Sequence, residues 1–224
     1  SGPDKARRWT VLPALCGVLL LGRQVFSWPG LEWLLLAAAL TLPLSGVLTY
    51  GKPQALTFTD VCAMAAAGFA IPWAFSGLYG LRMLEGGYLL VLTPLVAAFC
   101  SDALALFTGM ALGRHKLAPL VSPHKTVEGA AGGLVGGMAG MAIFCLVYRA
   151  ITGVNLGLPL CVALGLLGAL LGELGDLSFS AVKRQYGIKD YGRLLPGHGG
   201  VLDRFDSVLF AAPVLCALLR ALAA

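Results

Sequence analysis

Charged residues are scarce in this sequence of 224 residues, of which Asp, Glu, Lys and Arg together make up only 12%. Soluble globular domains carry about 25% charged residues, so this scarcity excludes an ordinary soluble domain. Hydrophobic residues make up 58% of the chain, which is typical of an integral membrane protein. A net charge of +5 in such a protein indicates loops facing anionic headgroups, so no nucleic acid partner is expected.

Paired cysteine motifs are absent as well. All six cysteines lie in apolar runs, and none belongs to a CxxC pair. They are interpreted as small packing residues, which excludes a disulfide framework and a cysteine zinc site.

Long apolar runs, by contrast, recur along the chain. A membrane-spanning helix needs about 20 mostly apolar residues. Seven runs approach this length: 9–25, 31–48, 61–79, 87–112, 128–148, 157–176 and 201–222. The predicted fold is therefore all-α, a polytopic membrane protein with about seven transmembrane helices and cytoplasmic catalytic loops. Twelve of the 16 Lys and Arg residues fall on one side of these spans, which predicts that side to be cytoplasmic.

Local signals divide the chain further. Residues 1–8 are expected to be a tail that opens with the remnant of a cleaved tag, 9–86 the N-terminal transmembrane helices, and 87–224 the catalytic region. Thr59 and Asp60 are predicted to cap the third helix, and Ser122 with Pro123 to begin the fifth. A separate amphipathic segment is expected over 177–186. The glycines of 129–140 form two interleaved GxxxG series, which predict a close helix contact and leave a homodimer open.

The most polar stretch runs from Ser180 to Asp206. Basic residues alternate there with glycines, and glycines allow backbone N–H groups to approach phosphate oxygens. The stretch ends in Asp203 and Asp206, which lie three residues apart and so share a helix face. This pattern predicts a phosphate-binding loop beside a carboxylate pair. The other reading of the basic residues is the ordinary excess of positive charge on cytoplasmic loops.

Five acids need a reason to lie in or beside the predicted spans, because a charge at membrane depth costs several kcal/mol unless it is paired or hydrated. Their oxygens suit Mg²⁺, which takes one or two carboxylates together with substrate phosphate. The alternative is that each acid merely pairs with an arginine. The acids are Asp102, Glu173, Asp176, Asp203 and Asp206.

The stretch resembles the signature of the phosphatidate cytidylyltransferases, or CDP-diacylglycerol synthases. The matching residues are Ser180, Lys183-Arg184, Lys189-Asp190, Gly192, Leu195-Pro196, His198-Gly199-Gly200 and Asp203-Arg204-Phe205-Asp206. A second segment, from Gly113 to Pro119 and from Ser122 to Gly129, is also similar to the family. The likeness covers the chain from about Asp102 onward. The sequence departs from the family after Asp102, where Ala103-Leu104-Ala105-Leu106 replaces small hydroxyl and aromatic residues.

The resemblance implies that CTP and phosphatidic acid condense to CDP-diacylglycerol and pyrophosphate with Mg²⁺, a second cation being left open. The expected setting is a bacterial inner membrane with the site facing the cytoplasm, and the expected partners are CTP, phosphatidic acid and membrane lipids. The predicted catalytic residues are Asp176, Lys183, Asp203 and Asp206. The predicted metal ligands are Asp176, Asp203, Asp206 and Glu173. The predicted substrate-binding residues are Asp102, Lys125, Glu128, Ser180, Arg184, Lys189, Arg193, His198, Gly199 and Gly200.

Within that set, Lys183, Arg184 and Lys189 are assigned to the triphosphate. The assignment for Asp102, Lys125 and Glu128 is the lipid or metal side of the site.

Two other functions remain open. A CTP-dependent lipid kinase of the dolichol or phytol kinase type would release CDP, whereas a cytidylyltransferase releases pyrophosphate. A transporter would use intramembrane acids for ions, but the chain shows no inverted repeat. CDP-alcohol phosphotransferases are disfavoured, because their DGxxAR-type motif is missing.

Overall fold

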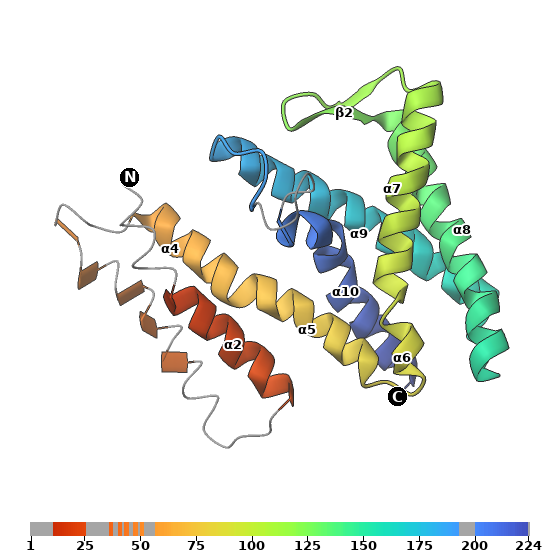
Figure 1. Cartoon of the computed structure of the whole chain (residues 1–224), viewed down its shortest axis with the longest axis horizontal. Helices are drawn as coiled ribbons and strands as arrows, with labels where there is room; N and C mark the ends of the chain where they lie inside the picture. Colours follow the sequence, from red (N-terminus) through yellow and green to blue (C-terminus); the bar gives the residue numbers. More distant parts are fainter. Residues whose placement is uncertain are drawn as a thin grey trace. The chain divides into compact units, whose positions relative to one another are not determined.

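The computed structural model describes residues 11–25, 57–192 and 200–223, together with 36–37, 40–41, 43–44, 47–48 and 50–51. The chain divides into two compact units, Ser1–Tyr79 and Gly80–Ala224. The fold is mostly helical (Figure 1), as the sequence predicts. In the order of the chain the elements are α2 (Val11–Val25), α4 (Phe58–Ala65), the π-helical turn η1 (Ala66–Ala70), α5 (Ile71–Arg82), α6 (Gly87–Leu90), α7 (Thr93–Leu112), β1 (Lys116–Ala118), β2 (Ser122–Thr126), α8 (Val127–Thr152), α9 (Leu158–Gln185) and α10 (Leu202–Ala223).

Five helical segments of the described chain are long and apolar enough to cross a membrane. They are Phe58–Arg82, Gly87–Leu112, Val127–Thr152, Leu158–Gln185 and Leu202–Leu222. They correspond to the last five of the seven predicted spans. The first predicted span coincides with α2, which is 15 residues long. The second, 31–48, lies largely outside the described residues, so the count of seven is not confirmed. The chain is a polytopic, mostly helical membrane protein.

The first unit contains the cap of α4. Thr57 accepts a hydrogen bond from the Asp60 backbone N–H, and the Asp60 side chain accepts one from the Thr57 N–H, at 3.2 and 2.9 Å. This reciprocal pair is a capping box. Asp60 was correctly predicted to take part in the cap, but the capping threonine is Thr57 and not Thr59. A capping box places the threonine three residues before the acid. Pro72 follows directly after η1, at the second residue of α5.

Glycines bring the helices of the second unit into close contact, as the interleaved series predicts. A Cβ atom on Gly137 of α8 would lie 2.6 Å from the Ala169 Cβ of α9. On the neighbouring face of α8, a Cβ on Gly136 would lie 2.8 Å from the Leu104 Cβ of α7. The glycine series is thus used for contacts within the chain, which removes it as an argument for a homodimer.

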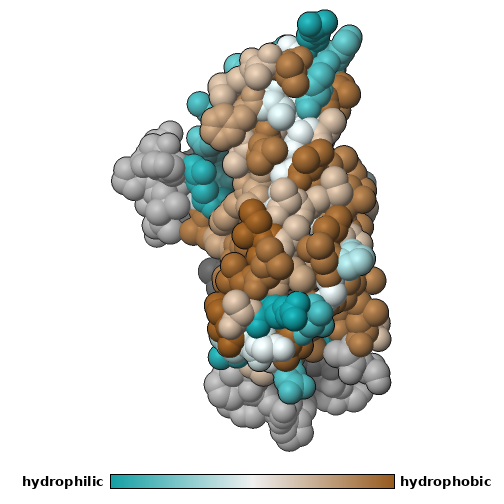
Figure 2. Space-filling model, turned by 90° about the vertical axis from the view of Figure 1, so that its right-hand side faces the viewer, coloured by the Kyte–Doolittle hydropathy of each residue, from teal (hydrophilic) through white to brown (hydrophobic). Residues whose placement is uncertain are grey.

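Hydrophobic side chains cover most of the middle of the face shown in Figure 2, and hydrophilic ones lie above and below them, including at the top, the end where the β hairpin lies in Figure 1. Inside the unit, Leu81, Met141 and Leu215 are fully buried in one hydrophobic cluster. Apolar residues therefore serve both the core and the outer surface.

Two local predictions were wrong. The polar loop after α7 contains an antiparallel hairpin of β1 and β2, with Lys116 opposite Thr126. Helix α8 begins at Val127, because the Thr126 side chain caps it by accepting a hydrogen bond from Gly129 N–H at 3.0 Å. Ser122 and Pro123 lie in β2 instead, and a two-stranded sheet tolerates proline because both of its strands are edges.

The second correction concerns α9, which runs unbroken for 28 residues from Leu158 to Gln185. The separate amphipathic segment predicted over 177–186 is the last part of this helix. No proline occurs between Pro159 and Gly187, so the backbone hydrogen bonds continue past Gly172 and Gly175 to the good helix formers Lys183, Arg184 and Gln185.

Candidate active site

Helix α9 carries one polar face toward its C-terminal end. Glu173, Asp176, Ser180 and Lys183 recur at intervals of three or four residues, so their side chains lie on one side of the helix. The start of α10 brings Asp203 and Asp206 to this face, and β2 brings Lys125. The structure therefore unites residues that are up to 81 positions apart in the sequence.

Lys183 is the buried centre of the α9–α10 contact. Its Nζ donates a hydrogen bond to Asp203 Oδ1 at 3.0 Å and lies 4.0 Å from Asp206 Oδ2. The side chains of Lys183 and Asp203 are only 11% and 7% exposed. A buried charge is tolerated when it is paired and hydrogen-bonded, so this lysine and the two aspartates depend on one another.

The second oxygen of Asp203 holds the ends of the glycine-rich loop. Asp203 Oδ2 accepts hydrogen bonds from Tyr191 N–H at 2.8 Å and from Gly200 N–H at 2.9 Å. The Tyr191 ring lies 5.5 Å from Lys183 Nζ, and its hydroxyl donates to the Phe179 carbonyl at 3.0 Å. Burial raises the pKa of the Tyr191 phenol, and the carboxylates of Asp203 and Asp206 raise it further, so the hydroxyl stays a donor.

A second lysine–aspartate pair joins the hairpin to α9. Lys125 Nζ lies 2.5 Å from Asp176 Oδ2, and the two side chains are 26% and 27% exposed. Asp176 Oδ1 accepts a weaker hydrogen bond from the Ser180 hydroxyl at 3.3 Å. Nearby, Arg184 Nε donates to the Val121 carbonyl at 3.2 Å, so the hairpin is attached to α9 at two points.

Glu128 has a different set of partners from the other predicted residues. Its Oε2 accepts hydrogen bonds from the backbone N–H groups of Arg114 and His115 at 3.1 and 3.2 Å. Its Oε1 lies 2.6 Å from His115 Nδ1. These contacts hold the chain between α7 and the hairpin in place. In this geometry Glu128 therefore has a structural role.

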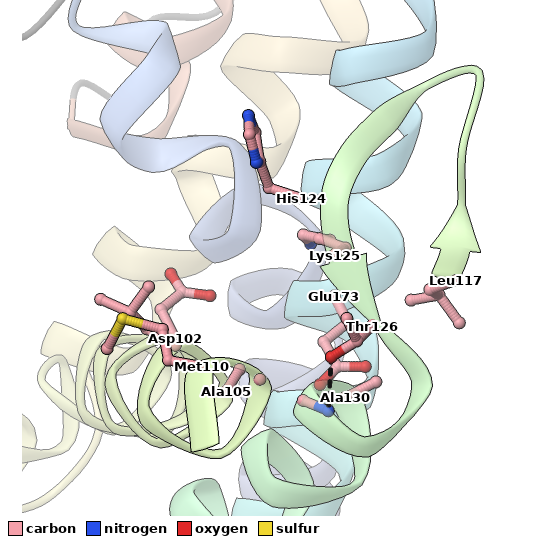
Figure 3. A pocket seen from close by; sticks show the side chains of 12 residues that line it. Asp102, Ala105, Met110, Leu117, His124, Lys125, Thr126, Ala130 and Glu173 are labelled. Atoms are coloured by element: carbon pink, nitrogen blue, oxygen red, sulfur yellow. Dashed lines mark hydrogen bonds between the residues drawn. The ribbon is translucent and has the colours of Figure 1, made fainter. Parts of the chain in front are cut away.

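A pocket of about 420 Å³ lies between α7, α8, the hairpin and α9. Figure 3 shows Asp102 and Met110 on α7, with Leu117 and His124 on the hairpin and with Lys125 and Glu173 nearby. The remaining lining residues are small or apolar apart from Thr126: Ala105, Leu106, Gly109, Gly129 and Ala130. The pocket therefore combines apolar walls with one lysine and two acids.

The donor set fits a divalent cation in part. Among the described residues, no three His, Cys, Asp or Glu side chains already form a cation site. Glu173 Oε1 is nevertheless buried without a hydrogen-bond partner in the described part of the chain, and Glu173 lies within electrostatic range of Asp102 and Asp176. Asp206 is likewise in range of Asp176. Asp203 fits less well, because its oxygens already accept three hydrogen bonds.

Other predicted site residues are placed as follows. Arg184 is exposed at the end of α9, and Lys189 is exposed just beyond it. Gly200 is buried beside Asp203. A Cβ on Gly200 would lie 2.9 Å from Gly192 N, so glycine is needed for this close approach. The predictions for Arg193, His198 and Gly199 fall outside the described residues.

Sequence reasoning missed several residues of the site. Leu117 and His124 line the pocket only because a hairpin forms, and short strands give little periodic signal. Tyr191, which contacts Lys183 and Asp203, was not predicted either, although it lies in the sequence between the basic residues and the glycines of the polar stretch. Ser101 gave no signal in the sequence. Its buried hydroxyl lies beside Gly133 and, like Glu173 Oε1, has no hydrogen-bond partner among the residues that the structure describes.

Comparison with known proteins gives consistent matches. The profile of the cytidylyltransferase family matches residues 3–222. The phosphatidate cytidylyltransferase of Bacillus subtilis is 38% identical over 220 residues, which cover 93% of this chain and 78% of the relative. That of Staphylococcus saprophyticus is 36% identical over 204 residues, covering 90% and 75%. That of Staphylococcus haemolyticus is 39% identical over 158 residues, covering 70% and 58%.

Proposed function

The chain belongs to the cytidylyltransferase family, and from this premise we propose that it is a phosphatidate cytidylyltransferase. It condenses CTP with phosphatidic acid to give CDP-diacylglycerol and pyrophosphate for phospholipid synthesis. Relatives that carry this name match 90% and 93% of the chain. The proposed location is a bacterial cytoplasmic membrane with the site on the cytoplasmic side.

The observation that carries the proposal is the meeting of two kinds of surface at one end of α9. The segment that begins after Gln185 is basic in sequence, and its residues 186–190 are exposed, which suits a polyanionic nucleotide. The pocket beside Asp176 has apolar walls on the membrane-spanning helix α7, which suit a lipid. An enzyme that joins a water-soluble triphosphate to a bilayer lipid needs both surfaces side by side.

The reaction balances as follows. An oxygen of the lipid phosphate attacks the α-phosphorus of CTP and forms a new P–O bond. The bond between the α-phosphorus and the bridging oxygen to the β-phosphate breaks, and its electrons leave with pyrophosphate. The attacking phosphate is already ionised near neutral pH, so no strong general base is required. The site therefore has to orient the two substrates and balance their negative charge.

Basic residues at the end of α9 are proposed to orient the triphosphate. Arg184 keeps further N–H groups besides the one that binds the Val121 carbonyl, and Lys189 is exposed. Lys183 is proposed to act indirectly. It pairs with Asp203, which holds the ends of the glycine-rich loop, and with Asp206, an acid of the site. Ser180 donates a hydrogen bond from its hydroxyl to Asp176 and is proposed to orient this carboxylate.

Asp176, Glu173 and Asp206 are the proposed ligands of Mg²⁺, with Asp102 close by. When bound, this cation neutralises charge on the phosphates. Asp203, predicted from the sequence as a further ligand, is better suited to hold the loop in the state described here, because its oxygens are taken by Lys183, Tyr191 and Gly200.

The direct test incubates purified protein with CTP, Mg²⁺ and phosphatidic acid and measures both the lipid product and the released phosphates. The expected result is CDP-diacylglycerol with pyrophosphate in equal amounts. Release of CDP with a phosphorylated lipid would instead identify a lipid kinase. The Asp206→Asn variant tests the proposed cation ligand. It is expected to remain folded in detergent and to lose turnover, and wild-type activity of this variant would refute the role of Asp206 as a ligand.

A further inference from the structure

The pocket between α7, α8, the hairpin and α9 is lined in part by exposed apolar side chains of α7. Leu106 and Met110 line it, and they are also 60% and 67% exposed. Both residues belong to the candidate membrane span Gly87–Leu112. Apolar side chains that line a pocket and remain exposed on a membrane helix provide a continuous apolar path from the bilayer. An amphiphile can enter along such a path without exposing its chains to water.

The inner end of the pocket is charged and centres on Lys125. This lysine lies beside Asp176 at 2.5 Å and within electrostatic range of Asp102 and Glu173. In the state described here, one ammonium group therefore balances several carboxylates. The rest of the lining is mostly small or apolar, with His124 and Thr126 as the other polar side chains. A lysine in front of apolar walls suits a phosphate on an acylated glycerol.

We propose that this pocket binds the phosphomonoester end of a bilayer lipid, and that the incoming phosphate draws Lys125 away from Asp176 and frees this carboxylate for a divalent cation. The inference rests on the proposed function and adds an order in which the lipid and the cation bind. Because Lys125 and a divalent cation compete for Asp176, cation binding is weak until lipid arrives. By linkage, lipid and cation then increase each other's affinity.

The exposure of the pair supports an exchange of partners. The Lys125 and Asp176 side chains are about one quarter exposed, and no other hydrogen bond within the described residues holds the Lys125 ammonium. The Lys125 stem is flexible, and β2 is short, so the ammonium can follow a phosphate over a few ångströms. Glu173 lies three residues before Asp176 on the same face of α9, and its Oε1 is buried without a hydrogen-bond partner among the described residues, so it offers a second ligand once Asp176 is free.

The test measures Mn²⁺ binding to the purified full chain in detergent, by the electron paramagnetic resonance signal of free Mn²⁺. Titrations are run alone, with dioctanoyl phosphatidic acid, with inorganic phosphate and with CTP. Wild-type protein is expected to bind Mn²⁺ about tenfold more tightly with the lipid, a typical coupling between linked sites. The Lys125→Met variant is expected to bind Mn²⁺ tightly without lipid and to change less than about twofold when lipid is added.

Two further variants keep the test sharp. Lys116→Met changes an exposed lysine on the paired strand of the same hairpin and should behave as wild type. Met110→Trp narrows the pocket from the α7 side, away from Lys125 and Asp176 on the hairpin and α9, so it should weaken the lipid effect and leave lipid-free Mn²⁺ affinity unchanged. The Met110→Trp result stands even if Lys125→Met fails to fold.

Several results would overturn the proposal. Lipid-free Mn²⁺ affinity in Lys125→Met no higher than in wild type would do so, as would full lipid coupling in that variant. An equal effect of inorganic phosphate would show that the apolar walls contribute nothing. Coupling by CTP alone would assign the pocket to the nucleotide. If the wild type makes CDP-diacylglycerol but shows no lipid effect on Mn²⁺, this inference fails and the proposed function stands.

Discussion

Two lysine–aspartate pairs stabilise the polar end of the second unit, and they are enclosed to different degrees. Lys183 and Asp203 are nearly buried, and Asp203 accepts two further backbone hydrogen bonds. Lys125 and Asp176 are about one quarter exposed, and within the described residues Asp176 accepts one further, weak hydrogen bond, from Ser180. The first pair is enclosed and fixed by backbone hydrogen bonds, whereas the second is open enough to exchange partners. The same two residue types thus give a fixed support in one place and an adjustable contact in the other.

The largest expected effect comes from breaking the enclosed pair with Lys183→Met. Removing one partner of a buried ion pair leaves the other charge uncompensated and costs about 3–5 kcal/mol. We expect a lower melting temperature in detergent, low yield and no turnover. Lys189→Met, at an exposed site just after α9, is the control and should melt as wild type. An unchanged melting temperature in Lys183→Met would show that the enclosed pair is not a support.

The next effect comes from the adjustable pair. Asp176→Asn keeps the shape and can still accept a hydrogen bond from Lys125, so the melting temperature should change little. Turnover should fall by at least about 100-fold, because a charged ligand at the reacting phosphates is lost. The measurement is CDP-lipid formation alongside thermal melting. A large loss of stability with little loss of rate would reverse the roles given to the two pairs.

A smaller effect is expected at the second attachment of the hairpin. Arg184→Met removes the hydrogen bond to the Val121 carbonyl, worth about 1 kcal/mol. Hydrogen exchange of the backbone amides in 116–126 should become roughly fivefold faster, since local opening becomes easier. Exchange at 200–206, which the enclosed pair holds, should stay unchanged. Equal acceleration in both segments would mean that the two regions open as one.

The smallest effect is expected for Tyr191→Phe. The variant loses the hydrogen bond to the Phe179 carbonyl but keeps an aromatic ring over Lys183. Stability should fall by about 1 kcal/mol, as for one intramolecular hydrogen bond. Turnover should remain close to wild type. A loss of rate as severe as that of Asp176→Asn would place the Tyr191 hydroxyl among the groups that act on substrate.

The sequence predicted the last five spans well, because apolar length is a sufficient signal for a membrane helix. It did not predict that α9 continues to Gln185, since Glu173, Asp176 and Lys183 resemble a helix end when their partners are unknown. Their partners Lys125, Asp203 and Asp206 lie on other elements. Polar residues can continue a helix at a membrane surface when neighbouring elements satisfy them.

The site was predicted by residue type more than by arrangement. Asp176, Lys183 and Asp206 do lie near one another, but which lysine faces which acid depends on tertiary contacts that spacing does not encode. The hairpin was missed for the same reason. Its strands are three and five residues long, and its contacts with α9 through Lys125 and Arg184 are absent from any local pattern.

The unbroken length of α9 has a consequence for depth. Its 28 residues extend about 42 Å, whereas the hydrocarbon core of a bilayer is about 30 Å thick. A straight helix that crosses this core from Leu158 would reach the headgroup level near Asp176 and project beyond it toward Gln185. The proposed site would then lie at the depth of the lipid phosphates, so a lipid could react without leaving its leaflet.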